Sequence, residues 1–168
     1  KRITNCYNTG TISGNNDIGG VCGSNIGAIT NCYYLYGTCS TGIGSGDGSA
    51  EVKTANRFAS GEIAYSLSQG SKIDSVPYPG DVWGQNIDKE APYDASPVLG
   101  GEKVYKGYNE CVEAYSNSEL SDAPREHVYD ENGLCTVCGQ DESGAVSLGD
   151  ANNDGKVNVA DAAYIARI

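Results

Sequence analysis

Short stretches of alternating apolar and polar residues fill the first 47 positions of the chain, and glycine and asparagine separate them. Residues 28–34 form one such β-type stretch. Asn5-Cys6-Tyr7 recurs 26 residues later as Asn31-Cys32-Tyr33, and Gly10-Thr11-Ile12-Ser13 recurs as Gly37-Thr38-Cys39-Ser40 with one residue inserted. A period between about 20 and 50 residues is typical of stacked coils. The pattern predicts a mainly β chain that begins with a short, incomplete β-solenoid over residues 1–47.

A different pattern follows over residues 48–108. Ile63, Ala64 and Leu67 lie on one side of a helix that we predict over 61–68, with Ser60 as its N-cap and Gly70 at its end. Short strands are predicted at 82–85, 97–99 and 103–105, between proline and glycine turns. We interpret this part as a small α+β cap on the solenoid. Residues 42–49 are nearly all Gly, Ser, Asp and Thr, which predicts a flexible connector or an end to the coils.

The composition favours several small stapled units over one large core. There are 23 Gly and 12 Tyr but only 1 Phe and 1 Trp. The net charge of -11 repels phosphate backbones, so nucleic-acid binding is not expected. No run of about 18 apolar residues predicts a membrane span. The chain contains no Met, so we expect a processed piece or an internal fragment of a longer protein.

Glycine-rich motifs in the first segment resemble a known repeat. Gly19-Gly20-Val21-Cys22-Gly23, Asn25 and Gly27, followed by Asn31-Cys32-Tyr33, resemble the GLUG repeat of bacterial surface proteins. The order Phe-Ala-Ser-Gly-Glu at 58–62, Trp-Gly-Gln at 83–85 and Pro-Val-Leu at 97–99 is similar to the segment that often follows these repeats. The resemblance implies an architecture and an extracellular location, and no activity.

A cysteine pair near residue 135 predicts a metal site. Cys135 and Cys138 form a CxxC motif followed by Gly139, and this turn lets two thiolates hold one zinc ion. His127 lies eight residues before the motif, and Cys111 lies sixteen residues before His127. We predict a Cys3His zinc site in a zinc-knuckle-like module over residues 109–142. The alternatives are a disulfide between Cys135 and Cys138 or free thiols.

Oxygen-bearing residues at fixed spacing near the C-terminus predict a calcium loop. They occupy positions 1, 3, 5, 7, 9 and 12 of a twelve-residue loop, position 7 through its backbone carbonyl, and Gly155 at position 6 makes the sharp turn. These predicted calcium ligands are Asp150, Asn152, Asp154, Lys156, Asn158 and Asp161.

The calcium loop departs from a helix–loop–helix EF-hand, because Asp161 stands where Glu is usual and no helix precedes Asp150. With the helix predicted over 159–168, it resembles the first repeat of a dockerin, the module that binds cohesins of scaffoldin proteins. The resemblance implies that residues 143–168 are a linker and one dockerin repeat, and that cohesin binding needs a second repeat. It places the cohesin-contacting positions at Val159, Ala160, Ala166 and Arg167.

Several remaining residues admit more than one role. Cys6, Cys22 and Cys32 sit at repeat positions and are expected to stack inside the coils, with a disulfide as the alternative. Tyr33, Tyr34 and Tyr36 are expected to pack, with a platform for sugar rings as the alternative. Trp83 is expected in the core. His127 is the only His, so no Ser-His-Asp or Cys-His nucleophile system stands out.

The sequence thus predicts a non-catalytic, secreted or cell-surface structural and adhesion fragment. A calcium-binding dockerin repeat would attach it, through a cohesin, to a cellulosome-like or cell-surface complex. Cell-surface or plant glycans are further candidate partners. The alternative is the C-terminal accessory tail of a secreted glycoside hydrolase or peptidase.

Overall fold

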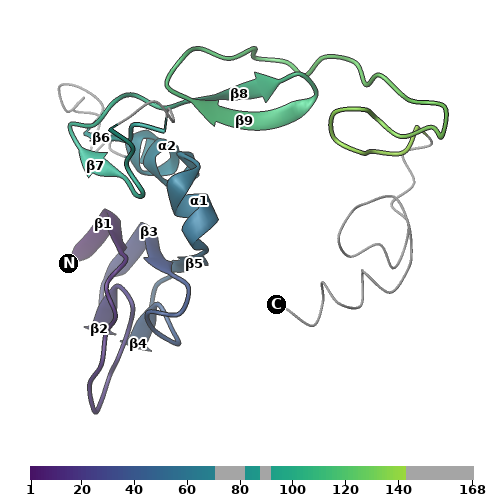
Figure 1. Cartoon of the computed structure of the whole chain (residues 1–168). Helices are drawn as coiled ribbons and strands as arrows, with labels where there is room; N and C mark the ends of the chain where they lie inside the picture. The colour runs from purple at the N-terminus through teal and green to yellow at the C-terminus, as the bar shows by residue number, and fades with distance from the viewer. Residues whose placement is uncertain (71–81, 88–91, 143–168) are drawn as a thin grey trace. The chain divides into compact units, whose positions relative to one another are not determined.

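The computed structural model describes residues 1–70, 82–87 and 92–142, and strands predominate over helices among them (Figure 1). The predicted calcium loop and cohesin-contacting positions lie outside the described residues. The chain divides into two compact units, Lys1–Lys106 with Tyr115–Leu120 and Gly107–Ala114 with Ser121–Ile168. We refer to them as unit 1 and unit 2, and each is described by itself.

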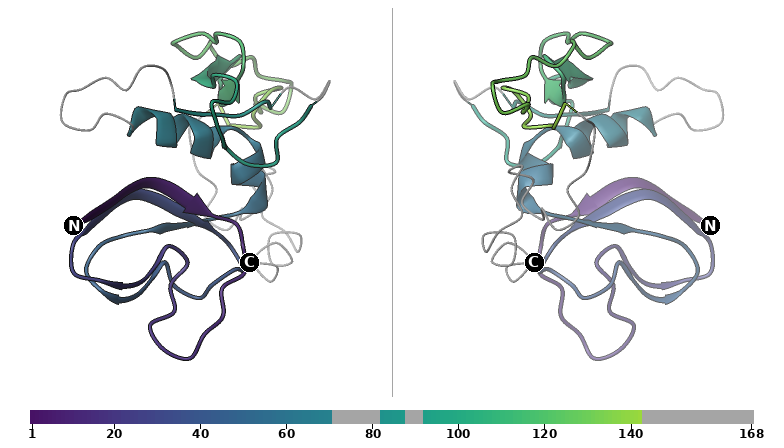
Figure 2. Two further views of the ribbon diagram at one scale, coloured as in Figure 1. Left: turned by 90° about the vertical axis from the view of Figure 1, so that its left-hand side faces the viewer. Right: turned by 90° about the vertical axis from the view of Figure 1, so that its right-hand side faces the viewer.

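Unit 1 begins with two parallel sheets that the chain visits in turn. One sheet has the order β1 (Arg2–Asn8), β3 (Ala28–Leu35) and β5 (Glu51–Lys53), and the other pairs β2 (Cys22–Asn25) with β4 (Ile43–Gly46). The two sheets lie on opposite sides of the coiled chain (Figure 2). In the β1–β3 pair, Cys6 aligns with Cys32 and Tyr7 with Tyr33. The 26-residue repeat of the sequence is therefore the register of these strands.

Equivalent asparagines occupy the same place in β1 and β3. Asn5 and Asn31 have positive φ angles of 54° and 51°, a left-handed conformation that asparagine tolerates better than most residues. The Asn31 amide donates to Asn5 Oδ1 at 2.7 Å and to the Ser66 carbonyl at 3.0 Å. The Asn5 amide donates to the Gly70 carbonyl. The stacked asparagines thus donate to the carbonyls of Ser66 and Gly70 at the C-terminal end of a helix.

Two helices cover the outer face of the first sheet. They are α1 (Ala55–Ala59), capped by Thr54, and α2 (Glu62–Gln69), with Gly61 as N-cap and Gly70 as C-cap. Phe58, Ile63 and Leu67 are buried against Tyr33 in the core of unit 1, and Tyr7, Leu35 and Trp83 pack around this cluster. The predicted helix is confirmed within one residue at each end. Its N-cap is Gly61, and Ser60 instead ends α1 while its hydroxyl accepts from the Glu62 N–H at 3.4 Å.

The segment after the helices adds a short antiparallel ribbon to unit 1. β6 (Trp83–Gly84) pairs with β7 (Val98–Leu99), as the predicted strands in these regions anticipated. Trp83 Nε1 donates to the Asn5 carbonyl at 3.1 Å, and its ring lies edge-on to Tyr7. The residue is partly buried and packs against the core cluster, close to the core position that was predicted. Gln85 is fully buried and donates to the Phe58 carbonyl at 2.8 Å. These bonds tie the ribbon to α1 and to β1.

A hairpin of β8 (Tyr105–Asn109) and β9 (Val112–Ser116) contains the boundary between the units. In unit 2, isolated antiparallel bridges join Tyr108 to Ser121, Tyr129 to Cys135 and Leu134 to Asp141. Unit 2 has little regular structure otherwise among its described residues. Such a small module buries little apolar surface, so its fold depends on turns and on a staple such as a disulfide or a bound metal.

One of the two roles expected for residues 42–49 is wrong. They do not form a flexible connector throughout, because Ile43–Gly46 is strand β4, paired in parallel with β2. Backbone hydrogen bonds form this pairing, so the small polar side chains of the segment do not prevent it. None of the helices in the described part of the chain is long and apolar enough to cross a membrane.

Candidate metal centre

Four predicted zinc ligands meet in unit 2. Cys111, His127, Cys135 and Cys138 each present one ligand atom, and these atoms all lie within 4.8 Å of one another. Cys111 comes from the turn between β8 and β9, and the other three come from the segment that follows. We call these four residues the Cys/His cluster. Its donor set can hold a metal ion such as zinc.

Distances within the cluster match a tetrahedral ion. Cys111 Sγ lies 3.7 Å from Cys135 Sγ, and Cys138 Sγ lies 3.4 Å from His127 Nδ1. A tetrahedron with bonds of about 2.3 Å to sulfur and about 2.05 Å to nitrogen has S···S edges of about 3.8 Å and S···N edges of about 3.6 Å. All seven cysteines of the chain are free thiols, so the alternative Cys135–Cys138 disulfide is not formed in this structure.

Local turns hold Cys135 and Cys138 in place. Before them, Asp130 Oδ1 accepts the N–H groups of Asn132 at 2.8 Å and Leu134 at 3.0 Å. After them, Gly139 has a φ of 73° and its N–H donates to the Cys135 carbonyl at 2.8 Å. A residue with a Cβ is strained at that φ, which explains why glycine follows the CxxC motif. The hydrogen bonds that shape this turn are thus local in the sequence.

The electrostatics of the cluster favour a cation. The pKa of Cys135 is lowered to about 5, chiefly because the backbone N–H of Cys138 donates to its sulfur. The pKa of Cys111 is raised to about 11 by desolvation and by the neighbouring Cys138 and Cys135 thiols. Thiolates this close together disfavour further deprotonation, and a divalent cation removes the conflict because it binds thiolates. Zinc would then be held by three sulfurs and Nδ1 of His127, with no position left for substrate.

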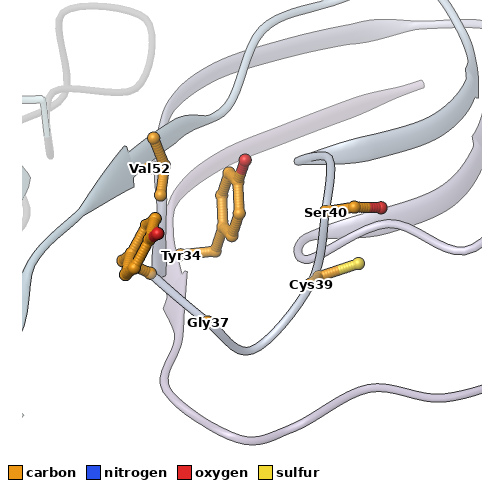
Figure 3. Close-up of a pocket in the computed structure, with 6 residues that line it drawn as sticks. Tyr34, Gly37, Cys39, Ser40 and Val52 are labelled. Atoms are coloured by element: carbon orange, nitrogen blue, oxygen red, sulfur yellow. The ribbon is translucent and has the colours of Figure 1, made fainter. Parts of the chain in front are cut away.

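A shallow pocket in unit 1 is a second candidate site. It has a volume of about 440 Å³ and is lined by Tyr34, Tyr36, Gly37, Cys39, Ser40 and Val52 (Figure 3). The sequence did not indicate Ser40 or Val52 as binding-site residues, because the pocket combines residues from β3, the turn after it and β5. No periodic pattern in the sequence connects residues from these three separate segments.

The alternative of a tyrosine platform for sugars finds little support. Tyr33 is buried in the core and Tyr34 is only 6% exposed, whereas Tyr36 is 67% exposed. Packing, the expected role, is therefore correct for two of the three. One exposed ring beside a shallow pocket does not define a ligand class, so we assign no function to it.

Cysteines of the coil region occupy different environments. Cys6 and Cys32 align on neighbouring strands, and the Cys6 thiol donates to the Cys32 sulfur at 3.4 Å. Cys22 lies in the other sheet, where its thiol donates to the Ser24 carbonyl. The expected stack of three cysteines is thus a pair with a separate third member.

Comparison with known proteins adds no relative to these observations. No protein-family model, curated protein or solved structure matches the chain.

Proposed function

We propose that this chain is a non-catalytic extracellular structural protein. In this proposal a β-solenoid of GLUG-type repeats is followed by a zinc-stabilised module and by a dockerin-like repeat that binds calcium and attaches the protein to a cohesin. The observation that carries the proposal is the Cys/His cluster, whose four donors have the spacing of a closed structural site. A closed site contributes folding energy and offers no open position for catalysis.

The stacking of equivalent repeat residues on neighbouring strands supports the solenoid part of the proposal. β1 and β3 run parallel, with Thr30 hydrogen-bonded to Thr4 and Asn31 to Asn5, each 26 residues apart. β5 then extends the same sheet. Coils stacked in this way bury their inner residues mainly against neighbouring coils, which suits a stalk or an adhesion surface.

The cohesin part of the proposal rests on the sequence. Asp150, Asn152, Asp154 and Asp161 keep the spacing of a calcium loop, and the pattern around them resembles a dockerin repeat. Three carboxylates at this spacing repel one another without a cation. Ion binding is therefore expected to order the loop.

The zinc proposal is tested by elemental analysis of the protein purified under reducing conditions. We expect about one zinc per chain, and loss of zinc in Cys138→Ser. Cys39→Ser is the matched control, because Cys39 lies outside the cluster and should leave the zinc content unchanged. Protein without zinc, or mass spectrometry that finds Cys135 bonded to Cys138, would overturn the proposal.

The calcium proposal is tested by calorimetry. One repeat lacks the packing of a paired second repeat, so we expect a Kd near or beyond the weak end of about 10⁻⁴ to 10⁻³ M. Asp150→Ala should abolish the heat of binding, since it removes the first charged ligand. Adding a second repeat should tighten calcium binding and create cohesin binding. If that extended protein shows neither, the dockerin proposal fails.

A further inference from the structure

Cys6 and Cys32 are placed so that a covalent bond can join two stacked strands. They are directly aligned on the parallel strands β1 and β3, and their sulfurs lie 3.4 Å apart. Neighbouring strands are about 4.8 Å apart, within the range of about 4.4–6.8 Å between Cα atoms that disulfides span. Small side-chain rotations therefore suffice to bring the sulfurs to bonding distance.

Cys6 and Cys32 differ in solvent exposure and in the pKa of their thiols. Cys32 is 2% exposed, whereas Cys6 is half-buried, so an external reagent reaches Cys6 first. The hydrogen bond from the Cys6 thiol lowers the pKa of Cys32 to about 6, and the same bond raises the pKa of Cys6. A lowered pKa favours the thiolate form of Cys32, and the thiolate is the nucleophile in disulfide exchange.

The other two cysteines of this region are placed differently. The Cys22 thiol donates to the Ser24 carbonyl at 3.3 Å, in the second sheet. Cys39 lines the pocket of Figure 3, on the turn after β3. Of these four cysteines, only Cys6 and Cys32 lie directly opposite each other on paired strands. The structure therefore favours one specific disulfide among them, between Cys6 and Cys32.

We propose that Cys6 and Cys32 are a disulfide-forming pair that staples neighbouring coils under oxidising conditions, with a small disulfide of the glutathione class as oxidant. The Cys6 thiol, the more exposed of the two, loses its proton as its sulfur attacks one sulfur of the oxidant, which forms the mixed disulfide and releases one thiolate. The Cys32 thiolate then attacks Cys6 Sγ in the mixed disulfide and releases the second. Two protein thiols are oxidised, the oxidant is reduced, and the two released thiolates take up the two protons that the cysteines lost.

The disulfide would hold β1 against β3, at the edge of the sheet. Coils of this kind are held mainly by their neighbours, so the outer strand β1 separates from the stack when its contacts with β3 and the helices fail. A bond between residues 26 positions apart restricts the unfolded chain and raises Tm by roughly 10 °C. This inference goes beyond the proposed function and does not depend on zinc or calcium.

The experiment is peptide mapping of the full chain after incubation with oxidised glutathione and alkylation of the remaining thiols. Cleavage before Asp17 and Asp47 separates residues 1–16, which hold Cys6, from residues 17–46, which hold Cys32. We expect these two fragments to be joined, and fragmentation of the joined species to locate the bond at Cys32. Because the map is read on the unaltered chain, the result does not depend on a variant that folds poorly.

Variants and melting complete the test. Cys22→Ser with Cys39→Ser should keep the crosslink, and Cys32→Ser should lose it. Trp83 fluorescence should report a Tm about 10 °C higher in the oxidised protein than in the reduced protein. A bond from Cys6 to Cys22 or Cys39, unjoined fragments after oxidation, or an unchanged Tm in the crosslinked protein would overturn the proposal. Zinc content is measured separately, so failure here is distinct from failure of the metal proposal.

Discussion

At the scale of single residues, Asn31 connects the repeat to the helix above it. Its amide binds Asn5 and the Ser66 carbonyl, its Oδ1 accepts the Tyr33 hydroxyl at 2.6 Å, and its φ is positive. Asparagine meets all these needs, because it has a donor and an acceptor and tolerates the left-handed region. The repeated asparagine thus joins the stacked strands to α2 and adopts the backbone conformation that this position requires.

We expect Asn31→Ala to destabilise unit 1 by about 2–3 kcal/mol, since it removes these bonds and strains the backbone. Asn31→Gly is the matched variant, because it removes the same bonds without the strain. Urea unfolding followed by Trp83 fluorescence should rank the original chain first, the Gly variant second and the Ala variant last. Equal stability of all three would show that the stacked asparagines contribute nothing.

Asp130 has a comparable role in unit 2. The backbone N–H groups of Leu134 and Asn132 donate to its carboxylate and lower its pKa. A carboxyl group with a lowered folded pKa contributes stability that is present above its unfolded pKa of about 3.9 and is lost only as the pH falls further. Its contribution is therefore complete at neutral and mildly acidic pH.

We expect Asp130→Ala to release zinc at a higher pH than the original chain does, because the turn before Cys135 is then less ordered. Asp130→Asn keeps the acceptor oxygen and should fall between them. Glu131→Ala, in the same exposed turn, is the control and should not move the midpoint. A zinc-sensitive dye read during an acid titration supplies the measurement, and identical midpoints for all four proteins would contradict the role of Asp130.

At the scale of elements, Gly70 shows that a correctly predicted helix end had a different cause. A glycine after a helix usually supplies a left-handed φ, yet Gly70 has a φ of -80°. A Cβ at this position would lie 2.1 Å from Asn31 Nδ2 and 2.2 Å from Asn5 Oδ1. The helix end therefore needs glycine for the close approach of the asparagines.

Gly70→Ala should accordingly cost about 1–3 kcal/mol in unit 1, although alanine favours helices more than glycine does. Gly14→Ala is the control, because its Cβ would meet the Ile18 side chain at an ordinary 3.4 Å. Thermal melts followed at Trp83 compare the two variants. A Gly70→Ala protein as stable as the control would mean that the asparagines move aside without cost.

The sequence predicted features that depend on local or repeated residues, and it did not predict features that residues distant in the sequence assemble. The 26-residue repeat identified the β1–β3 register, because equivalent residues stack directly. The spacing between β3 and β5 is shorter, since Tyr33 aligns with Glu51, 18 residues on, so no repeat revealed β5. The CxxC turn was predictable because it is local, and the four-ligand set followed from its spacing. The pocket of Figure 3 was not, because separate strands assemble it.

At the scale of the whole molecule, the two units use different sources of stability. Unit 1 has a buried cluster of Tyr33, Phe58, Ile63 and Leu67. The described residues of unit 2 bury little besides Cys135, which is 3% exposed and belongs to the Cys/His cluster. Metal binding in so small a module is folding energy. Removal of zinc should therefore act on unit 2 and spare unit 1.

This expectation can be measured because Trp83 is the only tryptophan and packs with Tyr7 in unit 1. After chelation of zinc, we expect unchanged Trp83 emission and an unchanged melt of unit 1. Hydrogen exchange should accelerate at the Tyr108 and Cys135 amides, which donate to Ser121 and Gln140, while α2 keeps its protection. Added zinc should restore the slow exchange, and Cys138→Ser should reproduce the chelated state. Loss of both units together would show that unit 1 depends on the metal, and the independence inferred from their different sources of stability would be wrong.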